Sequence, residues 1–318
     1  MERAATADRL DPRGAGRTRR TGRAVGSAHP WDTRGVPDNL APRGLLAVFA
    51  HPDDESFGAA GVLAMAVRAG VPVTLVCATN GDLGGPDQAH EMDPEIRHRE
   101  LRTAMAALGV GEPIFLGYND SGMENWERRP DGFAQVDPEA VVGRLVSIIR
   151  QVAPGVVLTF DPGGVYGHPD HVAISERATA AYRRTSGLPD GPRFLYHQAI
   201  PRSGIEEMRR IDEAQATLRG TPPREPTEDE LLQQRRIAEL ARPDEEITTV
   251  VDVRPVLDRK LAALAAHESQ MRDGSWGQAP RELIERWLGS ETFVRVDPPA
   301  TPGLRETWLG GLPDGIAR

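Results

Sequence analysis

The stretch LLAVFAHPDDE, residues 45–55, joins a short apolar run to a cluster of polar side chains. Consecutive apolar residues at 45–50 are typical of a strand buried on both faces of a parallel sheet. The polar residues come directly after the carboxyl end of that strand. In doubly wound sheets, ligands bind beyond this end of the strands. The stretch therefore predicts both a fold and the place of a functional site.

The same order of strand and helix continues along the chain. Further apolar runs predict strands at 71–79, 113–118, 155–160 and 193–200. Helical patterns lie between them, including two helix starts of the form Asp-Pro-Glu at 93–95 and 137–139. This alternation predicts an α/β, Rossmann-like fold, with a mostly parallel sheet and helices on both faces.

Composition divides the chain into five parts. Residues 44–200 are the expected catalytic α/β domain, and 247–300 are a C-terminal lobe that completes the same domain. Residues 1–43 hold nine Arg against five acidic residues without a hydrophobic period, so we expect a disordered basic extension. Residues 201–246, rich in charge and proline, are expected to form a polar insertion or lid. Residues 301–318 are expected to be a tail.

Charge and composition exclude several classes of protein. The net charge is −9, and residues 1–43 carry +4, so the rest carries −13 and disfavours a nucleic-acid partner. No apolar run approaches the roughly 18 residues of a membrane span. A single cysteine, Cys77, excludes an intramolecular disulfide and favours the cytoplasm. The expected partner is a small-molecule substrate, and the oligomeric state is left open.

Imidazole and carboxylate side chains follow two of the predicted strands. HPDDE at 51–55 follows the first strand, and HPDH at 168–171 follows the fourth. Zinc prefers such ligands, and catalytic zinc sites use three of them plus water. We therefore expect zinc at His51, Asp54 and His171. Fe²⁺ fits the same ligand set, because metal availability can decide between the two.

The remaining polar residues of these loops have the chemistry of amide hydrolysis. Asp53 would take a proton from the zinc-activated water. His168, protonated, would stabilise the oxyanion and then protonate the departing amine, with Tyr166 as a further hydrogen-bond donor. Asp170 would orient one of the histidines. Each motif alone would also serve as a helix-capping turn, and Glu55 is equally well explained as a solvated first-turn acid.

The two motifs together resemble the LmbE-like, PIG-L family of N-acetylglucosaminyl deacetylases, which includes enzymes of the mycothiol pathway. Further matches lie at 97–101, 116–123 and 260–270, and the resemblance covers about residues 44–297. It implies a Rossmann-like fold, zinc held by the residues chosen above, and an N-acyl amino-sugar substrate.

The resemblance also implies that Arg97 and Asp120 contact the sugar or polyol. The residues alone leave Arg97 as a solvated helix residue and Asp120 as part of an ordinary turn. His267 and Gln270 are expected on one helix face, in a packing role.

The sequence thus predicts a zinc-dependent hydrolase that removes an N-acyl group, expected to be acetyl, from an amino sugar. One alternative is an amidase of the same family that acts on thiol conjugates. Another is a metal-bearing sugar-binding module without turnover, but such a module has no need of the unligated carboxylate of Asp53. A nucleotide-binding enzyme is excluded, because HPDDE stands where a glycine-rich phosphate loop is required.

Overall fold

A computed structural model describes residues 43–84, 91–123, 129–208, 210, 228–271 and 280–313. Most of the expected basic extension (1–42) and the middle of the expected insertion (211–227) lie outside these ranges. Within them, no helix has the length and apolar character to cross a membrane. The cytoplasmic location stays a prediction.

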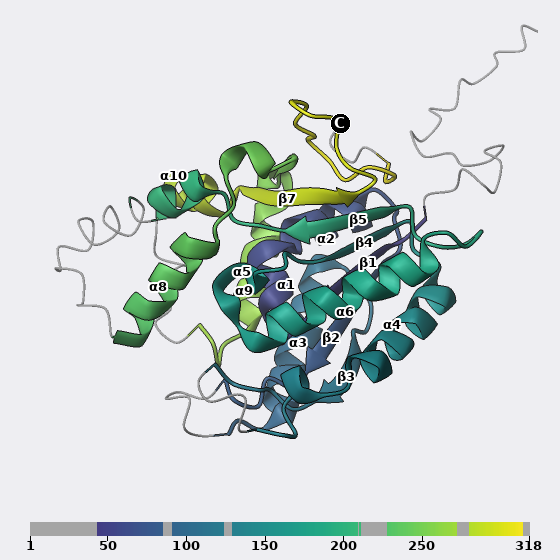
Figure 1. Ribbon diagram of the computed structural model, residues 1–318. Helices are drawn as coiled ribbons and strands as arrows, with labels where there is room; N and C mark the ends of the chain where they lie inside the picture. The colour runs from purple at the N-terminus through teal and green to yellow at the C-terminus, as the bar shows by residue number, and fades with distance from the viewer. Residues whose placement is uncertain are drawn as a thin grey trace, which may run out of the picture.

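A sheet of seven strands forms the centre of the molecule, in the order β3-β2-β1-β4-β5-β7-β6 (Figure 1). The strands are β1 (Leu45–Phe49), β2 (Val73–Thr79), β3 (Ile114–Tyr118), β4 (Val156–Phe160), β5 (Phe194–Gln198), β6 (Thr249–Asp252) and β7 (Ser290–Asp297). Strands β1 to β5 are parallel, whereas β7 is antiparallel to both β5 and β6. The predicted Rossmann-like fold is confirmed, and β7 is an element that the sequence did not indicate. The strand order reverses between β1 and β4, which is the switch point of the fold.

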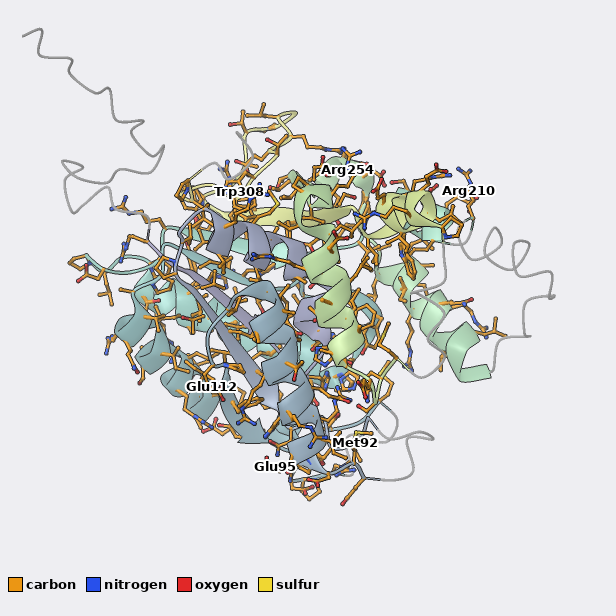
Figure 2. All side chains as sticks on the ribbon, turned by 180° about the vertical axis from the view of Figure 1, so that it is seen from behind. Met92, Glu95, Glu112, Arg210, Arg254 and Trp308 are labelled. Carbon is orange, nitrogen blue, oxygen red and sulfur yellow. The ribbon has the colours of Figure 1, made fainter. Side chains whose placement is uncertain are left out.

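Helices cover both faces of the sheet (Figures 1 and 2). On one face α6 packs on β4 and β1 and is flanked by α4, and on the other face α9 packs against α2 and α3. The bounds are α1 (Asp54–Gly58), α2 (Ala60–Arg68), α3 (Pro94–Leu108), α4 (Pro138–Val152), α5 (Gly164–Gly167), α6 (Pro169–Thr185), α8 (Glu228–Leu240), α9 (Leu257–Ala266) and α10 (Arg281–Leu288).

The two Asp-Pro-Glu sequences start helices as predicted. The Asp93 carboxylate accepts the Glu95 backbone N–H at 3.0 Å before α3, and Asp137 does the same for Glu139 at 3.1 Å before α4. Proline in the first turn loses no hydrogen bond there. Gly109 ends α3 in the left-handed conformation.

The C-terminal residues belong to the core of the domain. Trp308, Leu309 and Leu312 are buried in the main hydrophobic cluster, so these three residues of the expected tail pack into the domain. The expected insertion is also tied to the domain: the Arg242 backbone N–H donates to the Ile200 carbonyl at 2.8 Å. These segments carry too little apolar periodicity for their packing to be read from sequence.

A buried ion pair joins the C-terminal lobe to the start of α2. The Lys260 Nζ atom of α9 lies 2.7 Å from the Glu291 Oε1 atom of β7, with both side chains at most 2% exposed. The Glu291 carboxylate also accepts the backbone N–H groups of Gly61 and Val62, each at 2.8 Å. Since Ala59, the N-cap residue of α2, has no side-chain cap, Glu291 caps this helix from a distant strand.

Candidate active site

The two polar loops meet at the switch point between β1 and β4. His51 follows β1 and is 7% exposed, and His171 lies in the first turn of α6 and is 1% exposed. The His51 Nδ1 and His171 Nε2 atoms are 3.0 Å apart. The fold therefore brings together residues 120 positions apart in the sequence, because parallel strands place their carboxyl ends at one edge.

Asp54 completes a triangle of ligand atoms with these two histidines. Its Oδ1 atom lies 3.1 Å from His171 Nε2, and its Oδ2 atom lies 3.5 Å from His51 Nδ1. The backbone N–H of His51 donates to Asp54 Oδ2 at 2.7 Å and fixes the carboxylate. Ligand atoms bound tetrahedrally at zinc distances of about 2.0–2.1 Å are about 3.3 Å apart. The two nitrogens and the Asp54 carboxylate, which approaches each nitrogen with a different oxygen, thus lie at about the spacing of one face of a zinc tetrahedron.

The hydrogen-bond partners direct the free nitrogen of each imidazole into this triangle. His171 Nδ1 is 3.2 Å from the Gly164 carbonyl, which can only accept, so His171 Nε2 keeps its lone pair. His51 Nε2 is 3.2 Å from Asp170 Oδ2, which leaves His51 Nδ1 as the lone-pair atom. These tautomers follow from the partners. Three electron-pair donors then face one another, and a cation between them relieves their repulsion.

Asp170 and Asp120 extend the cluster on the far side of His51. His51, Asp120, His168 and Asp170 each offer a ligand atom within 4.8 Å of the others, as do His51, His168 and His171. Burial lowers the pKa of His51, but the neighbouring carboxylates of Asp120, Asp170 and Asp54 outweigh burial and raise the pKa well above its usual value. The carboxylates thus favour a positive charge at His51, which either a proton on Nδ1 or a metal cation bound to the Nδ1 lone pair supplies.

His168 lies beside the triangle as a neutral imidazole. Burial and the neighbouring rings of His51 and His171 hold its pKa well below the usual value, which disfavours the protonated state expected from sequence. The Asp170 backbone N–H donates to His168 Nδ1 at 3.2 Å. The ring proton is therefore on Nε2, which lies 3.9 Å from Asp120 Oδ1. A neutral His168 keeps one N–H donor for a substrate oxygen.

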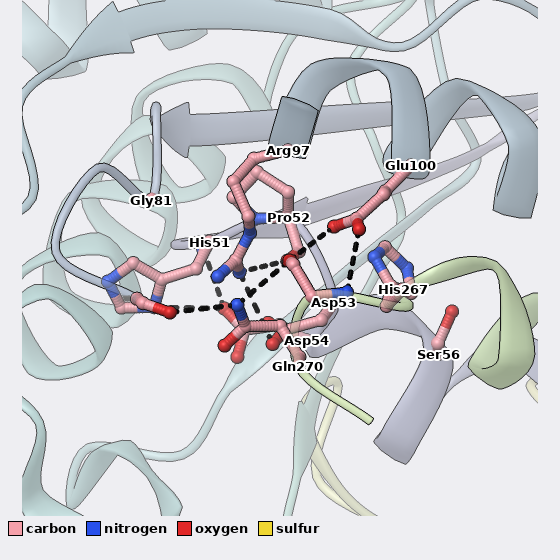
Figure 3. Close-up of polar contacts among 12 residues, drawn as sticks. His51, Pro52, Asp53, Asp54, Ser56, Gly81, Arg97, Glu100, His267 and Gln270 are labelled. Carbon is pink, nitrogen blue, oxygen red and sulfur yellow. Dashed lines mark hydrogen bonds and ion pairs between the residues drawn. The ribbon is translucent and has the colours of Figure 1, made fainter. Parts of the chain in front are cut away.

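Asp53 stands next to the triangle without belonging to it (Figure 3). Its side chain is 18% exposed, and its Oδ2 atom lies 3.3 Å from Arg97 Nη2. Burial raises its pKa to about 6, against the opposing effect of Arg97 and with a further increase from Asp54. A carboxyl group with this pKa can take up a proton and return it near neutral pH.

Glu55 and His267 lie behind Asp53, and sequence reasoning missed their connection. The Glu55 side chain is 1% exposed and accepts a hydrogen bond from His267 Nε2 at 2.9 Å. Glu55 is therefore neither a solvated residue nor part of the ligand triangle. His267 follows the last residue of α9, so the expected shared helix face of His267 and Gln270 was wrong. No local pattern around Glu55 indicates a partner 212 residues away in the sequence.

A cavity of about 810 Å³ opens beside the site. Asp53, Asp54, Tyr166 and His171 line one end of it. The Tyr166 ring packs edge-on against His171, with centroids 4.9 Å apart. The other end is lined by residues from the expected insertion and from α10, including Ser203, Glu207, Met208, Arg286 and Trp287. Two residues expected to contact substrate, Arg97 and Asp120, are 2% and 5% exposed and are not among the lining residues.

Comparison with known proteins gives consistent matches. Residues 46–182 match the PIG-L family, described as GlcNAc-PI de-N-acetylase. The 1D-myo-inositol 2-acetamido-2-deoxy-alpha-D-glucopyranoside deacetylase of Kineococcus radiotolerans is 38% identical over 264 residues, 72% of this chain and 69% of that protein. The enzyme of the same name from Acidothermus cellulolyticus is 37% identical over 276 residues, 82% of this chain and 91% of that protein.

Solved structures share the fold. The N,N'-diacetylchitobiose deacetylase of Pyrococcus horikoshii superposes with a TM-score of 0.53 and 20% identity, over 80% of this chain and 84% of that one. GalB, a 4-carboxy-2-hydroxymuconate hydratase from Pseudomonas putida, superposes with a TM-score of 0.51 and 18% identity, over 82% and 99%. Because a hydratase shares this architecture, the fold by itself does not define the reaction.

Sheet order and side-chain cluster together define a doubly wound α/β enzyme with a group of residues able to bind a metal. With relatives above 30% identity over most of their length, the chain belongs to the PIG-L family of deacetylases. It is accordingly a hydrolase, and the alternative of a sugar-binding module without turnover is set aside.

Proposed function

We propose that this enzyme is a zinc-dependent N-deacetylase whose substrate is an acetamido sugar linked to inositol. The single observation that carries the metal chemistry is the triangle of His51 Nδ1, Asp54 and His171 Nε2, with edges of 3.0–3.5 Å. The names of the two relatives above support the choice of substrate. Fe²⁺ has the same ligand preferences here, so the metal bound in the cell is a question of supply.

In this proposal His51, Asp54 and His171 hold zinc, which when bound supplies a Lewis acid that lowers the pKa of water. Asp53 accepts a proton from the water that attacks the acetyl carbonyl. The His168 Nε2–H and the Tyr166 hydroxyl donate hydrogen bonds to the carbonyl oxygen as it becomes negative. Hydrolysis then breaks the C–N bond and yields acetate and a free amine.

Asp53 is also the acid that returns the proton to the departing nitrogen. The sequence suggested His168 for this step, but a neutral imidazole would have to become an anion to release its remaining proton. A carboxyl group with a pKa of about 6 carries protons in both directions near neutral pH. Asp170 Oδ2, which also accepts the Ser121 N–H at 2.9 Å, orients His51 from behind.

An amidase acting on thiol conjugates is the second candidate, and the size of the cavity favours it. The cavity of about 810 Å³ reaches Met208 and Trp287, at the end remote from the His171 edge. Ligand pockets span about 300–1,000 Å³, so this one lies near the top of the range. A group attached beyond the sugar would meet Met208 and Trp287 there, together with the charged side chains of Glu207 and Arg286.

Two substitutions test the assignment. Asp53→Ala should keep bound zinc, measured by elemental analysis, and lose at least about 10³-fold in kcat, because the base is gone. His171→Ala should lose the metal. Near-wild-type kcat in Asp53→Ala would refute the general-base role, and full zinc content in His171→Ala would refute the ligand set. Two values of kcat/KM decide between the candidates: one for N-acetylglucosaminyl-inositol, and one for the same sugar with a thiol conjugate in place of acetyl on its nitrogen.

A further inference from the structure

The backbone of Asp53 is in a strained conformation. Its φ of 138° and ψ of −25° lie in a backbone region that residues other than glycine rarely adopt. Such a conformation is unfavourable and persists only when its surroundings enforce it. Asp53 is the N-cap residue of α1, yet its side chain makes no cap hydrogen bond and lines the cavity instead. Something other than local helix capping must hold it.

Glu55 holds the backbone of Asp53 from below. Its Oε2 atom accepts the Asp53 backbone N–H at 3.1 Å. Its Oε1 atom accepts the Ser56 hydroxyl at 2.5 Å and His267 Nε2 at 2.9 Å. His267 is 1% exposed and comes from the end of α9, on the C-terminal side of the chain. Both carboxylate oxygens of Glu55 are therefore occupied by groups that fix the Asp53 turn.

Arg97 holds the side chain of Asp53 from the opposite side (Figure 3). Its Nη2 atom pairs with Asp53 Oδ2 at 3.3 Å and also donates to the Pro52 carbonyl. The guanidinium is enclosed by two glycines: a Cβ atom on Gly84 would lie 2.1 Å from Arg97 Nη1, and one on Gly81 would lie 3.2 Å from Arg97 Cζ. This tight enclosure leaves the group aimed at Asp53.

We propose that Glu55, His267 and Arg97 are positioning residues that together clamp Asp53 in its strained conformation and aim its carboxylate at the reacting water. This inference rests on the proposed role of Asp53 as the base. It gives Arg97 a positioning role toward Asp53, and it gives His267 a function at a distance from the reacting atoms. A displacement of about 1 Å at a reacting group can cost about 10²-fold in rate.

The kinetic test uses two matched pairs of variants, assayed on N-acetylglucosaminyl-inositol with zinc content measured in parallel. His267→Ala should lower kcat about 10²-fold at unchanged KM and zinc content, and His267→Gln, which still offers an N–H to Glu55, should recover most of the loss. Arg97→Met should likewise lower kcat with KM within about threefold, and Arg97→Lys should recover part. A large rise in KM at unchanged kcat for Arg97→Met would overturn the clamp, since it would mean direct substrate contact.

Crystal structures of His267→Ala and His267→Gln test the clamp without using activity. The clamp predicts that Asp53 leaves positive φ in His267→Ala and retains it in His267→Gln. An unchanged Asp53 backbone in His267→Ala would overturn the inference, whatever the activity. If wild-type enzyme instead fails to release amine, or Asp53→Ala keeps its turnover, the proposed function is refuted while these structures still decide the clamp.

Discussion

In the buried pair of Lys260 and Glu291, replacing Glu291 should lower the free energy of unfolding more than replacing Lys260. Glu291→Ala leaves two helix amides, at Gly61 and Val62, without acceptors, at about 1–3 kcal/mol each. It also leaves the Lys260 ammonium, 1% exposed, without its partner 2.7 Å away. Removing one member of a buried pair typically costs about 3–5 kcal/mol. We expect about 5 kcal/mol in total, because the losses within one buried cluster overlap and do not add in full.

Lys260→Met should cost less, about 2 kcal/mol, because the remaining carboxylate still binds the two amides at the start of α2. The double variant should cost about 4 kcal/mol, less than the two single losses together, since no charge is left unpaired. Glu112→Ala is the matched control. The Glu112 side chain is 67% exposed, and its 2.6 Å ion pair with Arg102 should contribute under about 1 kcal/mol. Figure 2 shows Glu112 on the outside of the molecule.

Urea unfolding at pH 7 measures these differences, with the midpoint and the slope reported separately. The reasoning fails if Glu291→Ala costs no more than Glu112→Ala. It also fails if the double variant loses the full sum of the single losses, because the two side chains would then act independently.

Further predictions concern three other positions. Burial, with Arg242 and Arg183 nearby, lowers the pKa of His197 to about 4. Between about pH 6.5 and 4 the unfolded chain therefore binds a proton that the folded chain does not, so the free energy of unfolding should fall by up to about 3 kcal/mol as the pH falls. In urea unfolding measured at several pH values, His197→Gln should flatten this dependence. Asp170→Ala should weaken zinc binding about 10–100-fold in competition with a chelator, since His51 loses its orienting partner; unchanged affinity would exclude that role. His168→Ala should lower kcat about 10²–10³-fold with zinc retained, and an unaltered kcat would remove it from the oxyanion site.

Much of the fold could be predicted because local sequence patterns mark its central strands and helix starts. All residues of β1 and β4 are buried, and only Thr159 interrupts their apolar runs; the helix starts at Asp93 and Asp137 use a local capping signal. β7 escaped prediction, since it joins the sheet antiparallel between β5 and β6 and only two of its residues, Glu291 and Phe293, are buried. Its pairing depends on contacts with residues distant in the chain, which no local pattern encodes.

The position of the active site could also be predicted from the strands, whereas its electrostatics could not. His51 and His171 were expected to meet because each follows a strand at the switch point. Burial lowers the pKa of His168 most, followed by the rings of His51 and His171, and only folding buries His168 and brings His51 close to it. The His267 partner of Glu55 likewise lies 212 residues away in sequence, so a carboxylate that looks solvated in the sequence is buried in the fold.

The most direct test of the account is zinc-dependent amine release from N-acetylglucosaminyl-inositol by enzyme that has been stripped of metal and then reloaded. The account predicts that stripping abolishes release of the amine and that one equivalent of zinc per chain restores it in wild-type enzyme but not in His171→Ala. Release by stripped enzyme at the wild-type rate, or no release from any acetamido sugar by enzyme with zinc bound, would contradict it.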